Sequence, residues 1–194
     1  MVPRAVAEII VSENLFGCQA TRTAAKERSQ APRTEEDDHG TTMEYVKTAP
    51  GGIKALYGLE AYLSGCGLEP ALRELVKLRV SQINGCAYCI DMHTKDARAK
   101  GETEQRLYLQ DAWREAPVYN DRERAALAWT EAVTLITDGH APDEIYEQAR
   151  KQFTEQELVN LTLAIVAINA WNRLSIGFRA VAGSYGVKGG QTSR

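Results

Sequence analysis

The sequence predicts an all-α fold, and three observations lead to it. Apolar residues recur at helical spacing from Pro50 onward, glycine or asparagine closes the periodic segments, and no segment alternates as a β-strand does. Of the 194 residues, 44% are hydrophobic and 25% charged, which provides enough apolar material for one buried core. We expect a helical domain at residues 43–194, preceded by a polar leader at residues 1–42.

The leader is expected to be flexible or non-essential. Residues 17–42 are polar and lack a helical apolar stripe, whereas residues 4–16 have the pattern of a short amphipathic helix. Glu8 and Glu13 fall where an export signal needs an uncharged core. We therefore expect a cytoplasmic protein, in surroundings that keep cysteines reduced.

Composition also argues against two classes of partner. The net charge of −3 offers no basic surplus for a nucleic acid. The longest apolar run, "LTLAIVAINAW", stops at Asn172 and Arg173 and is too short to span a membrane. We expect neither nucleic acid nor membrane as a partner.

Three helices are predicted in the first half of the domain. The first opens near Pro50 and ends near the glycines at 65 and 67, because proline suits the first turn and glycine the end. The second opens at Pro70 and stops at Asn84–Gly85, two residues that tolerate the left-handed conformation. The third should run from Cys86 to Lys100, with a glycine stop at 101.

Four more helical segments complete the domain. Their expected bounds are residues 103–116, Asn120 or Asp121 to Gly139, residues 142–153, and a long last helix from the capping box at 154–157 to about Arg179. Asn169, Asn172 and Arg173 interrupt the apolar character of the last helix. Such polar groups need hydrogen bonds when buried, so we expect them near the thiols or at an interface.

The segment "NGCAYCIDMH" concentrates reactive side chains. On a helix, where each residue turns about 100°, Cys86, Cys89 and His93 fall within about 60° of one face. Ile90 and Ala97 share that side, and the charged residues Asp91, Lys95 and Arg98 lie opposite. We therefore expect the cysteines and the histidine to point inward. The other two cysteines, Cys18 and Cys66, are isolated in sequence.

This arrangement suits thiol chemistry. Cysteines three residues apart on a helix are about 5 Å apart at Cα, within the range of a disulfide, and so short a loop gains little stability from the bond. Cys86 opens the helix, where the dipole favours a thiolate, and His93 lies one turn beyond Cys89. The pattern favours a redox-active dithiol. Two alternatives stay open: a zinc site formed by these three residues with a carboxylate, and plain buried thiols.

The stretch "ELVKLRVSQINGCAYCIDMHTKDARAKG", Glu74 to Gly101, closely resembles alkylhydroperoxidase D-like proteins of the carboxymuconolactone decarboxylase superfamily. Their pattern is a glutamate, a C-x-x-C pair twelve residues later, and a histidine four residues after the second cysteine. Glu74, Cys86, Cys89 and His93 match it. "RERAALAWTEAVT" and "INAWNRLSIGFR" also fit, so the resemblance spans about residues 43–186.

The resemblance implies a helical homo-oligomer, a trimer or hexamer, that reduces hydroperoxides without a cofactor or metal. It implies that Cys89 is the peroxidatic cysteine and Cys86 the resolving one, with Glu74 and His93 as a proton relay. The partners would be a hydroperoxide and an external dithiol or disulfide reductant. A zinc-binding or structural redox-sensing oligomer, and a decarboxylase-like enzyme, are the alternatives. The decarboxylase branch generally lacks the cysteine pair.

Two features test this interpretation. Some peroxidases of the family have a histidine directly before the second cysteine, where this chain has Tyr88, a poor base at neutral pH. In one unbroken helix, Glu74 would lie about 18 Å from Cys86. Only a chain reversal at Asn84–Gly85 would bring this carboxylate to the thiols, and the alternative is a solvated surface charge.

Overall fold

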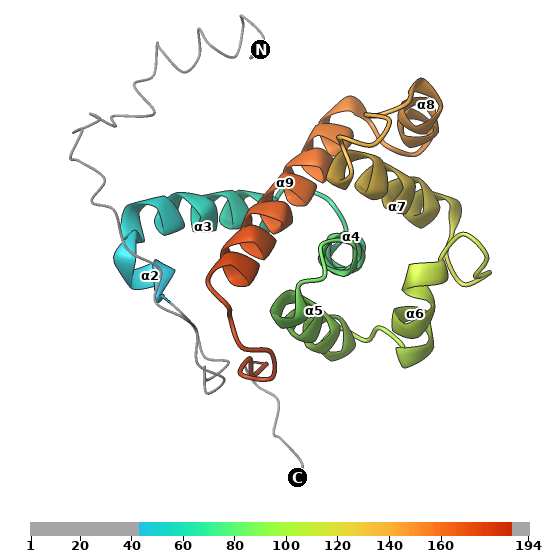
Figure 1. Ribbon diagram of the computed structural model, residues 1–194. Helices are drawn as coiled ribbons and strands as arrows, with labels where there is room; N and C mark the ends of the chain where they lie inside the picture. The colour runs from blue at the N-terminus through green and yellow to red at the C-terminus, as the bar shows by residue number, and fades with distance from the viewer. Residues whose placement is uncertain (1–42, 188–194) are drawn as a thin grey trace, which may run out of the picture. The chain divides into compact units, whose positions relative to one another are not determined.

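In the computed structural model, α4 (Pro70–Ile83) lies at the centre of the described helices, and α5, α7 and α9 pack against it (Figure 1). The structure describes residues 43–187 and contains no β-strand in that range, so the predicted all-α class is confirmed there. The elements are α2 (Tyr45–Thr48), α3 (Pro50–Ser64), α4 (Pro70–Ile83), α5 (Ala87–Ala99), α6 (Glu104–Leu109), the 3-10 helix η1 (Gln110–Ala112), α7 (Asp121–Thr134), α8 (Asp143–Gln152) and α9 (Glu155–Gly177). The proposed leader, with its short helix and Cys18, lies outside the described residues, as do residues 188–194.

Most predicted boundaries are confirmed. Pro50 and Pro70 begin α3 and α4, and capping boxes at Asn120 and Thr154 begin α7 and α9. Helix α9 ends at Gly177, two residues before the expected end. The segment at 103–116 is not one helix, because α6 gives way to the tighter turn of η1.

For the helix predicted from Asn120 or Asp121 to Gly139, the predicted end is wrong. Helix α7 ends at Thr134, and Leu135 is its C-cap. A hydrogen bond of 2.7 Å from the Asp138 N–H to the Leu135 carbonyl closes a turn there. Gly139 lies in a later turn with a φ of 75°. The side chains after Thr134 are exposed, so no buried face holds further residues in the helix.

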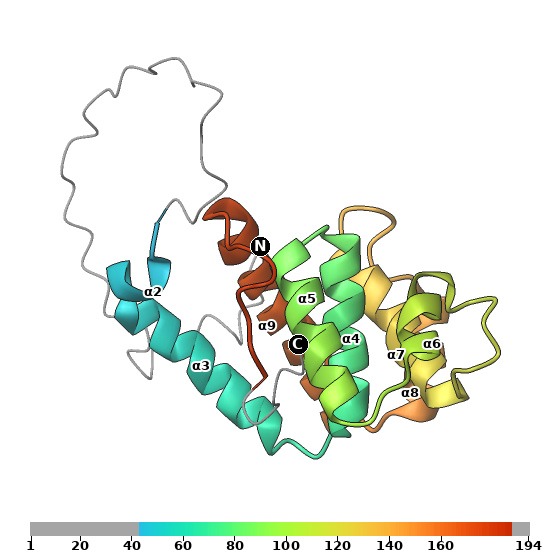
Figure 2. The same cartoon turned by 90° about the horizontal axis from the view of Figure 1, so that it is seen from below.

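The turn between α4 and α5 reverses the chain. Gly85 has a φ of 66°, a conformation that glycine adopts without steric cost. The Cys86 N–H donates to the Ser81 carbonyl at 2.9 Å, which closes the turn and leaves Cys86 as the N-cap of α5. The two helices then lie side by side (Figure 2). The reversal that the resemblance required is therefore present.

Helix α9 holds this turn in place. It packs against α3, α4, α5 and α7, and its inner face includes the buried residues Leu161, Ile165 and Ile168. The Asn84 side chain donates to Asn169 Oδ1 at 3.0 Å and to Asn172 Oδ1 at 2.9 Å. The predicted hydrogen bonds of the polar α9 residues are therefore present. They join the turn before Cys86 to a helix far along the chain.

The outer face of α5 departs from the expectation of full exposure. Asp91 and Lys95 are half-buried, because the segment after α9 lies on them. The Gly183 N–H donates to Asp91 Oδ2 at 3.0 Å, and Lys95 Nζ donates to the Tyr185 carbonyl at 3.0 Å. Periodicity within α5 could not reveal a segment that begins about 80 residues later. Among the described helices, none is long and apolar enough to cross a membrane.

Candidate functional site

Helix α5 places both thiols of the C-x-x-C pair inside the protein. Cys86 and Cys89 are free thiols, each 1% exposed, at the N-cap and in the first turn. His93 and Ala97 are buried on the same face, as predicted, and Ile90 is half-buried. The helix therefore points its reactive side chains toward α4 and α9.

Glu74 joins this site from α4. It is 8% exposed, and its Oε2 lies 2.9 Å from His93 Nδ1. Lys100, just past the end of α5, donates to Glu74 Oε1 at 2.6 Å. The alternative of a solvated surface charge is wrong for Glu74. Lys100 was not anticipated as part of the site, since it lies twenty-six residues from Glu74 in sequence.

The contacts of Glu74 fix which nitrogen of His93 carries its proton. Burial raises the pKa of Glu74, but the hydrogen bonds from His93 and then Lys100 outweigh it and lower that pKa to about 2. An ionised carboxylate only accepts, so Nδ1 must be the protonated nitrogen of a neutral His93. His93 Nε2 then has a free lone pair, and it has no hydrogen-bond partner in the part of the chain that the structure describes. A buried, oriented base results.

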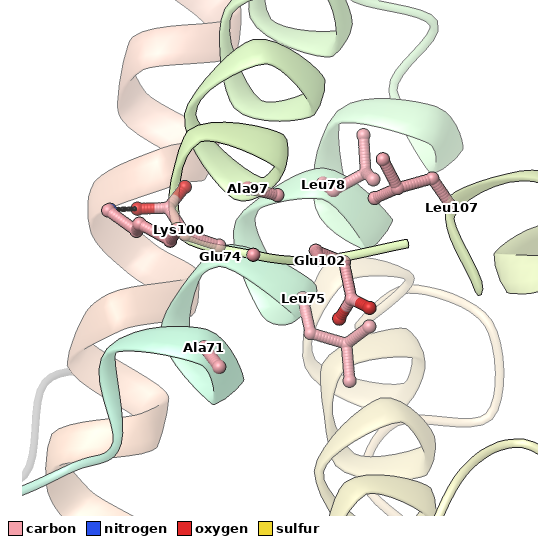
Figure 3. Close-up of a pocket in the computed structure, with 9 residues that line it drawn as sticks. Ala71, Glu74, Leu75, Leu78, Ala97, Lys100, Glu102 and Leu107 are labelled. Atoms are coloured by element: carbon pink, nitrogen blue, oxygen red, sulfur yellow. Dashed lines mark hydrogen bonds and ion pairs between the residues drawn. The ribbon is translucent and has the colours of Figure 1, made fainter. Parts of the chain in front are cut away.

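Two cavities meet at Glu74. One, of about 270 Å³, is lined by Cys89, His93, Ser175 and Glu74 among others, whereas Cys86 does not line it. The other, of about 130 Å³, lies between α4 and the end of α5, where Lys100 reaches Glu74 (Figure 3). Since the Lys100 side chain is half exposed, Lys100, Glu74 and His93 form a polar line from solvent to the larger cavity.

The two thiols differ in acidity. The hydrogen bond from Cys89 is the main cause that lowers the pKa of Cys86 to about 7, against a burial penalty. The backbone N–H groups at the start of α5 lower the pKa of Cys86 further. The Cys86 side chain itself makes no capping hydrogen bond to the helix. The pKa of Cys89 is raised, first by the neighbouring Cys86 thiol and then by burial. The two opposite shifts have one shared cause, the contact between the thiols, and they favour Cys86 as the sulfur with the negative charge.

Ser175 and Asn172 of α9 complete the surroundings of the thiols. Ser175 Oγ lies 3.7 Å from Cys89 Sγ, and it is buried. Asn172 is fully buried, and hydrogen bonding from both residues lowers the pKa of Cys89, against the larger effects of Cys86 and burial. Asn172 was noted from the sequence, but Ser175 was missed. The position of Ser175 three residues after Asn172 could have identified it, because residues three apart lie on one face of a helix.

One described group of side chains has the arrangement of metal ligands. Glu74, His93 and Asp96 each offer a ligand atom within 4.8 Å of the others. Neither cysteine belongs to this group, so it differs from the zinc site considered from the sequence. Glu74 already binds Lys100, and Asp96 accepts a hydrogen bond of 2.8 Å from the Tyr185 hydroxyl. A cation would have to compete with both contacts.

Lowering the pH should remove the contribution of Glu74 to the free energy of unfolding. Its pKa in the folded protein, about 2, lies below the ordinary 4.5, so its stabilising effect is present above pH 4.5 and is lost as the pH falls toward 2. Between pH 5 and pH 3 we expect the stability advantage of the wild type over Glu74→Gln to shrink by about 2 kcal/mol. Urea unfolding at each pH measures it. The stability difference between the wild type and Glu115→Gln, a substitution at an exposed position, should not change over this pH range.

Comparison with known proteins places this site in a family. A model of the carboxymuconolactone decarboxylase family matches residues 51–132, which include Glu74, both thiols of the pair and His93. The uncharacterized protein YdfG of Bacillus subtilis is 48% identical over 134 residues, which span 69% of this chain and 91% of YdfG. The alkyl hydroperoxide reductase AhpD of Acidobacterium capsulatum is 35% identical over 86 residues, 44% of this chain and 44% of AhpD.

Solved structures agree with this assignment. A protein of unknown function from Agrobacterium tumefaciens, for which an antioxidant defence role of the AhpD type has been suggested, is 46% identical. It superimposes with a TM-score of 0.73 over 75% of this chain and 100% of its own. The debrominase Bmp8, at 18% identity and a TM-score of 0.65 over 72% of this chain and 75% of its own, shares the fold alone. With the family model lying over the thiol site and YdfG matched along most of its length, the chain belongs to the carboxymuconolactone decarboxylase family.

Proposed function

We propose that the protein is a thiol-dependent peroxidase that reduces hydroperoxides through a dithiol–disulfide cycle of Cys86 and Cys89. The observation that carries this proposal is the buried contact of 2.9 Å between Glu74 and His93, which leaves His93 Nε2 unpaired beside the cavity that Cys89 lines. A base with an oriented lone pair that lines the same cavity as a thiol can take the proton of that thiol once substrate brings the groups together. The similarity to AhpD is consistent with this chemistry.

Access and acidity favour different sulfurs for the attack on peroxide. Cys86 has the lower pKa, whereas Cys89 lines the larger cavity and Cys86 does not. We give access the greater weight, because a sulfur that peroxide does not reach cannot react, whatever its charge. Transfer of the Cys89 proton to His93 Nε2 gives a thiolate at the accessible sulfur, and it leaves His93 protonated for the next step. Cys89 is therefore assigned as peroxidatic and Cys86 as resolving.

The proposed cycle balances with an external dithiol as the electron source. The Cys89 thiolate attacks the terminal peroxide oxygen, the O–O bond breaks, and the departing alkoxide takes a proton from protonated His93 to leave as an alcohol. Sulfur is oxidised by two electrons to a sulfenic acid. The Cys86 thiolate then attacks Cys89 Sγ, an S–S bond forms as the S–O bond of the sulfenic acid breaks, and the hydroxide takes a proton from solvent to leave as water. The reductant returns two electrons by thiol–disulfide exchange.

Tyr88 changes one part of this site relative to peroxidases that have a histidine there. Burial, followed by the charges of Tyr45 and Cys89, raises the pKa of Tyr88, so its hydroxyl stays protonated at neutral pH. In the cavity that it lines, Tyr88 is therefore able to donate a hydrogen bond but not to act as a base. Among the side chains that line this cavity, His93 is the imidazole base, and turnover depends on it.

The proposal includes a cytoplasmic homo-oligomer, a trimer or hexamer. Its support is the apolar outer surface of α9, where Val159, Val166 and Ile176 are each about half exposed. Exposed apolar side chains that gather on one helix often mark a surface that another protein or subunit covers. The resemblance implies that the partners are other copies of this chain.

A zinc-binding or structural redox-sensing protein is the alternative, and the group formed by Glu74, His93 and Asp96 is the observation that favours it. Thiol counting with metal analysis separates the two. One equivalent of peroxide should remove two thiols per chain without higher oxides. A Cys18→Ser/Cys66→Ser variant should lose the same two thiols. A zinc equivalent that survives dialysis, together with unchanged thiols, would favour the alternative.

A further inference from the structure

The larger cavity beside Cys89 has aromatic walls. Its volume is about 270 Å³, and it is lined by Tyr45 of α2, Tyr57 of α3, Tyr88 of α5 and Trp171 of α9, together with Met92. The rings of Tyr57 and Trp171 are tilted by 48° with centroids 5.1 Å apart. Tyr57 is 56% exposed, so the aromatic wall extends from the thiol to the surface. Aromatic walls favour a ring that can stack on them or meet them edge-on.

The size of the cavity exceeds what hydrogen peroxide needs. A water-sized molecule takes about 30 Å³, and a cavity of about 150 Å³ is known to hold benzene. The cavity of about 270 Å³ therefore has room for a substituted ring with a hydroperoxide group. Its reactive groups, Cys89 and His93, are buried, whereas Tyr57 is open to solvent. A molecule that fills the cavity with its polar end at Cys89 leaves its ring near Tyr57 and Trp171.

The charges of the cavity disfavour an anionic molecule. Three carboxylates line it, those of Glu60, Glu74 and Asp96, against one ammonium group, that of Lys77. Lys77 Nζ is already bound to Glu60 Oε2 at 2.6 Å, and the Lys77 side chain is only 12% exposed. A carboxylate in the cavity would meet like charges without an unoccupied cation among the lining side chains.

We propose that this cavity selects neutral arylalkyl hydroperoxides over hydrogen peroxide and over hydroperoxides that carry a carboxylate. This inference rests on the proposed peroxidase function and adds the class of substrate. The reaction with Cys89 is the one given above, with an aryl-substituted alkoxide as the leaving group. The ring remains on the aromatic wall while the O–O bond breaks, so its binding energy holds the peroxide against the sulfur.

Binding can be tested without any peroxide. The neutral product analogue 2-phenyl-2-propanol should bind the reduced wild-type protein in ligand-observed NMR. Its para-carboxylate derivative should bind at least tenfold more weakly. Tyr57→Ala should weaken binding of the alcohol about tenfold, because it removes one wall, and an exposed side chain can be truncated without unfolding. Tyr108→Ala, on α6 and 74% exposed, is the matched control and should bind as the wild type does.

Kinetics supply the second measurement. The rate constant for loss of the Cys89 thiol with cumene hydroperoxide, divided by that with hydrogen peroxide, should exceed the same ratio for free cysteine by about tenfold. Tyr57→Ala should lower that ratio several-fold, and Tyr108→Ala should not. Equal ratios for the protein and free cysteine, or equal binding of the alcohol and the carboxylate, would overturn the inference and leave the peroxidase proposal intact. Selective binding of the alcohol without oxidation of Cys89 by either peroxide would instead overturn the peroxidase proposal.

Discussion

Replacing Cys89 by serine is expected to abolish peroxide turnover, the largest effect of any substitution considered. In the proposed cycle, peroxide enters the cavity that Cys89 lines, and a serine hydroxyl there would not reduce it. Cys86→Ser should instead consume one peroxide and stop with a sulfenic acid on Cys89, because no second sulfur can displace it. Steady-state peroxide consumption and mass spectrometry of the trapped sulfenic acid measure the two outcomes.

The acidities of the two thiols make the opposite result informative. Because the pKa of Cys86 is lowered to about 7 while that of Cys89 is raised, Cys86 has more negative charge before peroxide arrives. Sulfenic acid on Cys86 in the Cys89→Ser protein, formed at the wild-type rate, would reverse the two roles. Cys66→Ser is the matched control, since Cys66 is half-buried and lies outside the cavity that Cys89 lines. It should leave turnover unchanged.

The second large effect concerns Glu74 and His93. Each of Glu74→Gln and His93→Gln should slow oxidation of Cys89 by roughly ten- to thousandfold, the range of a general acid–base step. In the proposed relay, His93 Nε2 receives the thiol proton, while the contact with Glu74 holds His93 in the tautomer that exposes this nitrogen. The double variant should be little slower than the slower single one, because members of one relay are not additive.

Single-turnover oxidation followed against pH measures the relay, with circular dichroism as the check on folding. Glu115→Gln, at an exposed position, should oxidise at the wild-type rate. The competing view treats His93 as core packing and Glu74 as a purely structural ion pair. It expects lower stability without a selective loss of rate. A folded Glu74→Gln protein with a near wild-type rate would leave the helix N-terminus and Ser175 as the activators of the thiols.

Local patterns explain how much of this protein could be predicted from its sequence. The proline starts of α3 and α4, the capping boxes of α7 and α9, and the inward face of α5 depend on residues within a few positions of one another. These local signals have the same meaning in any fold in which the helix forms. The early end of α7 was missed, because the residues after Thr134 have no buried face to hold them in the helix, and burial depends on the fold.

Proline starts, capping residues and apolar spacing were enough to predict most helices, the helix stop at Asn84–Gly85, and the placement of Cys86, Cys89 and His93 on one buried face. The family pattern added Glu74. Helix packing is what brings Lys100 to Glu74 and Ser175 to Cys89, and what gathers aromatic side chains from four helices around one cavity. This packing brings together residues up to 126 positions apart, such as Tyr45 and Trp171, which line the same cavity. No periodicity encodes such pairs, because helix packing rather than helix formation brings them together.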